Sequence, residues 1–167
     1  MQGVIAIDRL VKESYKKLPK FPDGRINYHG AGIAPVVTAY IFRQEKLLLL
    51  KRSEDVGHYK SMWDVVSGYL DEIKKPEEKA LEEVREELGI EPEAIAHLHR
   101  GSEFSIDDKE EGMEWVIALI YVRLANDIEI KLNFENTKYI WINPDSISMY
   151  KMVPGLEIGL RNVMQPY

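Results

Sequence analysis

The sequence contains no cysteine among its 167 residues. This excludes a disulfide scaffold, a Cys-ligated zinc or iron–sulfur site, and a thiol nucleophile. Long apolar runs are lacking too: the longest, Val116 to Val122, is far shorter than the roughly 20 residues that cross a bilayer. The first ten residues, MQGVIAIDRL, lack the basic-then-apolar pattern of a secretory signal. We therefore expect a soluble cytoplasmic protein that does not associate with membranes.

Basic charge is in deficit. The chain has 28 Asp and Glu against 22 Lys and Arg, a net charge of −6 and a pI near 5.3. General nucleic-acid binding is disfavoured, because the molecule as a whole carries no positive excess that would release counterions from a polyanion. Hydrophobic residues make up 45% of the sequence, enough for the core of one domain of this length. With no linker, repeat or low-complexity tract, we expect a single domain over residues 1–167.

Runs of branched and aromatic residues predict strands at 34–42, 46–52, 63–68, 113–124 and 138–142. The polar break Arg43–Glu45 predicts that the first two form a hairpin. Apolar residues at helical spacing predict helices near 7–18, 76–88 and 156–163. The expected fold class is α/β (α+β), with a mixed β-sheet sandwiched between helices. Residues 1–33 are expected to form an N-terminal helix and loop extension, and 34–167 the core with its C-terminal helix.

The helix expected at 76–88 carries most of the functional information. Pro76 suits its first turn, and Gly89 is placed to end it. At 100° per residue, Glu83, Glu86 and Glu87 share one arc beside the apolar stripe. Carboxylates on a rigid element are ligands that Mg²⁺ uses together with substrate phosphates. A solvated helix face is the alternative interpretation, so the arc by itself leaves both readings open.

The segment from 68 to 90, GYLDEIKKPEEKALEEVREELGI, resembles the Nudix box, G-x5-E-x7-R-E-U-x-E-E-x-G-U with U a bulky aliphatic residue. The positions in register are Gly68, Glu83, Val84, Glu86, Glu87, Gly89 and Ile90. The flanking stretches LLLLKRS, YIWINPDSI and VPGLEIGL resemble the family's strand, closing strand and terminal helix. The resemblance therefore covers about residues 34–163 and implies the Nudix fold.

Two positions depart from the family pattern. Lys74 stands where the family has Glu, and Glu82 stands where it has Arg. Because both signs are reversed, we expect the two side chains to form the family's loop–helix ion pair with the charges exchanged. The alternative is drift after loss of activity, which would leave the fold intact.

The resemblance implies hydrolysis of a diphosphate linkage in a small molecule, usually a nucleoside diphosphate derivative, with Mg²⁺ or Mn²⁺. By the same resemblance Glu83, Glu86 and Glu87 hold the metal. Glu135 is the first candidate for the general base and Glu114 the second. An acidic loop is expected to reach the metal site or to be a solvated turn; it comprises Glu103, Asp107, Asp108, Glu110 and Glu111.

Substrate contacts are expected from Arg52, whose guanidinium matches phosphate oxygens, and from Gly68. Ring stacking is open to three aromatic residues that core packing explains equally well: Tyr59, Trp63 and Tyr69. The four histidines show no metal-ligand spacing and are interpreted as structural; they are His29, His58, His97 and His99.

Two alternative functions are considered. Whether the chain forms a homodimer is left open by the sequence. The chain would alternatively be a non-catalytic Nudix-fold module that binds a nucleotide or a protein. An isomerase acting on isopentenyl diphosphate is disfavoured, because by family resemblance it needs an active-site cysteine.

Overall fold

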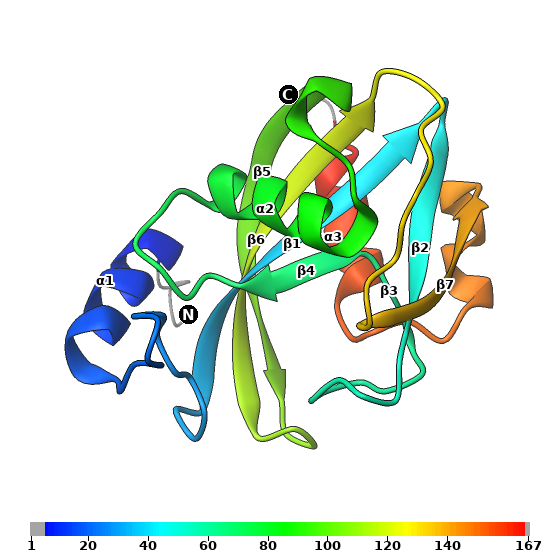
Figure 1. Cartoon of the computed structure of the whole chain (residues 1–167). Coiled ribbons are helices and arrows are strands. Elements are labelled where there is room, and N and C mark those ends of the chain that lie inside the picture. The colour runs from blue at the N-terminus through cyan, green and yellow to red at the C-terminus, as the bar shows by residue number, and fades with distance from the viewer. Residues whose placement is uncertain (1–5, 166–167) are drawn as a thin grey trace.

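The chain folds around a seven-stranded mixed sheet with helices on both faces (Figure 1). The computed structural model describes residues 6–165. The strands are β1 (Ile33–Arg43), β2 (Lys46–Arg52), β3 (Trp63–Asp64), β4 (Val66–Tyr69), β5 (Ile95–Asp108), β6 (Met113–Leu124) and β7 (Asn136–Ile142). The helices are α1 (Ile7–Lys17), α2 (Pro76–Leu88) and α3 (Leu156–Val163), with short 3-10 helices at Pro92–Ala94 and Pro144–Met149. The expected fold class is confirmed; residues 1–5 and 166–167 of the expected domain lie outside the described residues.

The centre of the sheet is the parallel pair of β1 and β6, in register from Ile33 opposite Glu114 to Phe42 opposite Arg123. The other pairings are antiparallel: β5 pairs with β6, and β2 pairs with β1, β3 and β7. The first half of β1 pairs with β4, which carries Gly68. This pairing brings the beginning of the Nudix-like segment to the middle of the sheet.

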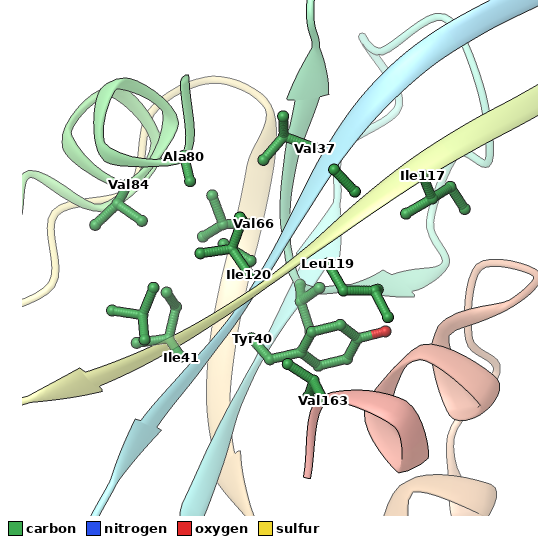
Figure 2. Packing of buried hydrophobic residues seen from close by; sticks show 14 of the residues in the cluster. Val37, Tyr40, Ile41, Val66, Ala80, Val84, Ile117, Leu119, Ile120 and Val163 are labelled. Atoms are coloured by element: carbon green, nitrogen blue, oxygen red, sulfur yellow. The ribbon is translucent and has the colours of Figure 1, made fainter. Parts of the chain in front are cut away.

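Alternation along the central strands divides the core into two layers (Figure 2). On one face, Val37 and Ile120 lie towards α2, whose Ala80 and Val84 are buried. On the other face, Tyr40 lies towards α3 and donates a hydrogen bond from its hydroxyl to the Leu156 carbonyl at 2.8 Å. The two helices therefore cover opposite faces, as expected for a sandwiched sheet.

The predicted hairpin is confirmed. β1 and β2 are joined by Gln44 and Glu45, whose φ angles of 50° and 51° match the tight primed turn that suits the twist of paired strands. α1, predicted from apolar spacing, packs its buried face against β1 and β6. No helix among residues 6–165 has the length and apolar character that a membrane crossing requires.

Two strand expectations were wrong in detail. The run expected at 63–68 is divided at Val65, whose N–H donates to the Asp64 carboxylate at 2.8 Å; β3 then pairs with β2 and β4 with β1. The expected acidic loop is also wrong, since Glu103, Asp107 and Asp108 belong to β5 and only Glu110 and Glu111 lie in the turn before β6. β5 was missed because it is a half-exposed edge strand whose register shifts between Arg100 and Glu103, so no clean alternation remains.

Candidate active site

α2 is a fixed platform for three carboxylates. Pro76 occupies its first turn and Gly89 ends it in the left-handed conformation, with φ 66°. Both ends of the helix fall at the residues that the sequence predicts. Because the apolar stripe is packed on the sheet, the adjoining arc of Glu83, Glu86 and Glu87 has a defined direction.

Glu83 lies against β4 at Gly68. A Cβ atom built on Gly68 would lie 2.4 Å from the Glu83 carboxyl carbon, so any larger residue would force the carboxylate to move away. Glycine at position 68 is therefore what allows the carboxylate to reach the backbone of β4. The structure gives Gly68 this packing role, and Gly68 also lines both clefts described below.

Glu87 is the most deeply buried of the three carboxylates, with 2% of its surface exposed. It accepts hydrogen bonds from the Ser67 N–H at 3.2 Å and from the Asn136 side-chain amide at 3.1 Å. These bonds join α2 to β4 and to the beginning of β7. Asn136 was not identified from the sequence; its position directly after Glu135 was the only signal.

An acidic cleft runs along this face of α2, and the exposed Glu86 and half-buried Glu135 open into it. Its acidic lining consists of Asp23, Asp71, Glu72, Glu82, Glu83, Glu86 and Glu135. The cations in the lining are Arg25 and Lys79. Carboxyl groups thus greatly outnumber cations in the cleft.

The carboxyl groups disfavour one another's ionisation. Burial raises the pKa of Glu83 to about 7, although Lys79 beside it acts in the opposite direction. The pKa of Glu87 is also raised, first by burial and then by the charges of Glu135 and Glu83. Burial raises the pKa of Glu135 in the same way. Binding of a positive charge among these carboxyl groups is therefore favourable.

The chemistry of these donors fits a hard divalent cation, because every donor is a carboxylate oxygen and the carboxyl groups of the cleft outnumber its two cations, Arg25 and Lys79. Within residues 6–165, no three Asp, Glu or His side chains are arranged so that they could hold a metal ion as they stand. The contacts give the reason: Lys79 lies 3.0 Å from Glu83, while Ser67 and Asn136 hold Glu87. Side-chain rearrangement on a fixed helix would be needed to complete the set.

A second pocket of about 170 Å³, called the aromatic pocket here for the rings in its wall, adjoins the acidic cleft. Its walls include Tyr59, Tyr69 and Trp115, with Trp115 donating a hydrogen bond to the Tyr59 hydroxyl at 2.9 Å. The Tyr59 hydroxyl in turn donates to Asp108. The Trp115 indole N–H and the Tyr59 hydroxyl both already donate hydrogen bonds. What the wall offers to a ligand is therefore the flat faces of its rings. Trp115 was not identified as a site residue from the sequence, and Asp108 was expected only as part of an acidic loop near the metal site.

Arg52 lies in the wall of the aromatic pocket, close to where the sequence places it. Its guanidinium donates to the buried Asp64 at 2.9 Å and to the His58 carbonyl at 3.0 Å. Arg52 therefore holds the loop that carries Tyr59, a role that the sequence did not indicate. His58, interpreted as structural, also lines this pocket and contacts Glu111.

Other candidates lie away from the two clefts. Trp63 packs edge-on against Tyr150 and does not line the aromatic pocket. Glu114 is exposed at the beginning of β6, outside the lining of both clefts, so the structure does not bring it to Glu135. His97 and His99 share a hydrogen bond on β5; the His99 ring stacks on Tyr121, and the His97 ring lies tilted to it.

Comparison with known proteins decides the family. A family model described as the NUDIX domain matches residues 32–164. The chain belongs to the NUDIX domain family. The expected Nudix resemblance is thereby confirmed.

Individual Nudix relatives are distant. The nucleoside triphosphatase NudI of Escherichia coli K12 is 27% identical over 124 residues, which cover 70% of this chain and 86% of NudI. Among solved structures, a Caenorhabditis elegans Ap4A hydrolase binary complex superposes with a TM-score of 0.65 at 18% identity, covering 77% of this chain and 93% of the hydrolase. A MutT NUDIX hydrolase from Burkholderia pseudomallei gives 0.65 at 21% identity, covering 79% and 98%. These structural likenesses establish the fold.

Proposed function

We propose that this Nudix protein cleaves a diphosphate linkage in a nucleoside diphosphate derivative, with Mg²⁺ or Mn²⁺ held by Glu83, Glu86 and Glu87. One observation carries the proposal: the acidic cleft and the aromatic pocket share a wall, formed by Ser67, Gly68, Tyr69 and Glu135. A molecule that joins a flat ring to two phosphates fits across this wall. The ring would occupy the aromatic pocket, and the phosphates would face the carboxylates.

The volume of the aromatic pocket supports a divided substrate. About 170 Å³ is less than the roughly 300–1,000 Å³ of pockets that enclose a whole drug-sized ligand. The pocket therefore suits one part of the substrate, and the rest extends into the acidic cleft. Stacking on aromatic faces is worth about 1–3 kcal/mol per base and tolerates different bases.

A bound divalent cation would neutralise charge on the bridging phosphate oxygens and lower the pKa of the attacking water. In the proposal, Glu135 accepts the proton of that water. Its support is position and environment: Glu135 lines both clefts, and burial raises its pKa towards the range in which a general base works at neutral pH. Arg52 would contact a phosphate oxygen from the pocket wall while keeping its bond to Asp64.

The relatives suggest which compounds to assay first. NudI is named as a nucleoside triphosphatase and one structural neighbour as an Ap4A hydrolase. A turnover screen would therefore include nucleoside triphosphates, dinucleoside polyphosphates, ADP-ribose and nucleotide sugars, each with Mg²⁺, with Mn²⁺ and with a chelator. We expect release of a phosphomonoester product only in the presence of the metal.

Three variants test the assigned roles. Glu87→Gln and Glu135→Gln should each lower kcat about 100-fold or more. A positioned general base such as Glu135 contributes about 10²–10⁴-fold, and Glu87 would hold the metal that stabilises charge developing in the transition state. Glu87→Gln should also remove the rise in melting temperature that Mn²⁺ gives the parent protein, since a ligand that binds only the folded state stabilises it. Glu93→Gln is the matched control, as Glu93 is exposed on a 3-10 helix outside both clefts. Turnover that survives in the chelator, or in both Glu87→Gln and Glu135→Gln, would contradict the proposal.

A further inference from the structure

Lys79 is a lysine buried among acids. Only 6% of its surface is exposed, and its ammonium lies 3.0 Å from Glu83, 3.4 Å from Asp71 and 3.7 Å from Glu82. A buried ammonium is costly unless it is paired. These carboxylates more than offset the burial and raise the pKa of Lys79, so it stays charged.

The contact with Glu83 places this charge beside a metal ligand of the proposed function, on which the inference rests. Lys79 and Glu83 are four residues apart on α2, so their side chains lie on the same face. A divalent cation on Glu83 and an ammonium 3.0 Å from the same carboxylate would repel each other at low effective dielectric. Lys79 therefore competes with a metal ion for Glu83 unless its ammonium has another place to go.

Asp71 provides that place. Its Oδ1 atom is buried and has no hydrogen-bond partner among residues 6–165, yet it lies only 3.4 Å from the Lys79 ammonium. A buried acceptor without a partner is rare and costly in folded proteins. Glu82 is the weaker alternative, because Lys74 already contacts its carboxylate at 2.5 Å. A small side-chain movement would bring Lys79 into hydrogen-bond range of Asp71.

We propose that Lys79 is a tethered counter-ion, whose ammonium neutralises Glu83 in the metal-free protein and transfers to Asp71 when a divalent cation binds. Lys79 is in this sense a positioning residue, since it acts through Glu83 and Asp71. The transfer keeps Glu83 paired in both states, with the Lys79 ammonium in one and with the metal ion in the other. It also satisfies the Asp71 oxygen only in the metal-bound state, which favours metal binding.

The test measures the affinity of the full chain for Mn²⁺ alone, by electron paramagnetic resonance at pH 8. Lys79→Met removes the competing ammonium and should tighten Mn²⁺ binding at least threefold. Asp71→Asn removes the negative charge of the second acceptor for the Lys79 ammonium. It should weaken Mn²⁺ binding at least threefold. When position 79 is already Met, adding Asp71→Asn should change the Mn²⁺ affinity no more than Glu72→Gln does. Glu72→Gln is the control for loss of charge, because it removes one charge from the neighbouring residue of the same cleft.

Lys75→Met is the control for loss of a lysine, because Lys75 is exposed at the beginning of the same helix. Unchanged or weaker binding by Lys79→Met, or an equal effect of Asp71→Asn with and without Lys79, would overturn the inference. If the parent protein binds no Mn²⁺, or if Glu83→Gln binds it equally well, the proposed function fails as well. Mn²⁺ binding that depends on Glu83 but not on Lys79 overturns only this inference and leaves the proposed function standing.

A crystal structure of the Mn²⁺ complex of the parent protein tests the same point without a variant. We expect the Lys79 ammonium within hydrogen-bond distance of Asp71 and separated from Glu83. An ammonium that still contacts Glu83 beside the bound ion would overturn the transfer.

Discussion

Lys74 and Glu82 form an ion pair, with the ammonium 2.5 Å from the carboxylate, that joins the loop after β4 to α2. The expected exchange of charges at these two positions is therefore confirmed as a contact. Each partner has a second neighbour: Lys74 lies 3.1 Å from Glu72, and Glu82 lies 3.7 Å from Lys79. The pair belongs to a network that reaches the face of α2 with the proposed metal ligands.

The first prediction concerns reversal of this pair. Lys74→Glu places a third acid beside Glu72 and Glu82, and Glu82→Arg places a cation beside both Lys74 and Lys79, so each single change should lower turnover and stability. The double change should recover part of the loss, with a favourable coupling of about 0.2–1 kcal/mol, as expected for a pair that is partly exposed. Recovery should be incomplete because Glu72 and Lys79 are unchanged. Urea denaturation and kcat measurements on all four proteins check this; additive losses would show that the contact has no energetic role.

The second prediction is that the metal-free protein loses stability as pH rises from about 4.5 to about 7. Burial raises the pKa of Glu83 to about 7 in the folded chain, above its ordinary value of 4.5. The folded state therefore binds more protons in this window, and the free energy of unfolding falls with rising pH. The raised pKa values of Glu87 and Glu135 act in the same direction.

Urea denaturation in a chelator at pH 5 and at pH 8 measures the effect. We expect Glu83 alone to contribute as much as about 3 kcal/mol of the difference, since each pKa unit corresponds to about 1.4 kcal/mol. Glu83→Gln should therefore show a smaller difference between the two pH values, and Glu93→Gln the same difference as the parent protein. Identical pH dependence in the parent and Glu83→Gln would contradict the assigned pKa.

The third prediction concerns Gly159 in α3. Alanine within a helix is ordinarily about 1 kcal/mol better than glycine. Here a Cβ atom would lie 2.3 Å from the Tyr40 hydroxyl and 3.0 Å from Leu119, so Gly159→Ala should instead destabilise by about 1–3 kcal/mol. Thermal unfolding measures the change. Gly57→Ala is the control, because nothing lies within 4 Å of a Cβ at that position; a stabilised Gly159→Ala would show that α3 moves freely on the sheet.

The fourth prediction tests the wall shared by the two clefts. Tyr69 lines both of them and lies 6.0 Å from Trp115, measured between ring centroids. If its ring stacks on a base, Tyr69→Leu should raise KM for the best nucleotide substrate by about 5- to 150-fold, which corresponds to about 1–3 kcal/mol, and change kcat little. Tyr139→Leu, at an exposed tyrosine on β7, should leave KM unchanged. A lowered kcat with normal KM would assign Tyr69 to the chemical step instead.

The helices and strands that show a clear local sequence pattern were predictable from that pattern. α2 has the expected ends because Pro76 and Gly89 act through their own backbone preferences, and the arc of Glu83, Glu86 and Glu87 follows from helical periodicity. The family, the fold class and the pairing of Lys74 with Glu82 were likewise predictable from fixed spacing and complementary charge.

The contacts that these residues make across the fold depend on tertiary structure and were not predictable. The approach of Gly68 to Glu83, the bonds that hold Glu87, and the joining of the two clefts all depend on strands far apart in the sequence. β5 could not be recognised because an edge strand with one exposed side and an irregular register lacks alternation. The contact of Lys79 with Asp71 exists because the chain that follows β4 places Asp71 against the face of α2. Local propensity fixes where helices and strands form, whereas the environment of a charge depends on contacts between segments that no local pattern records.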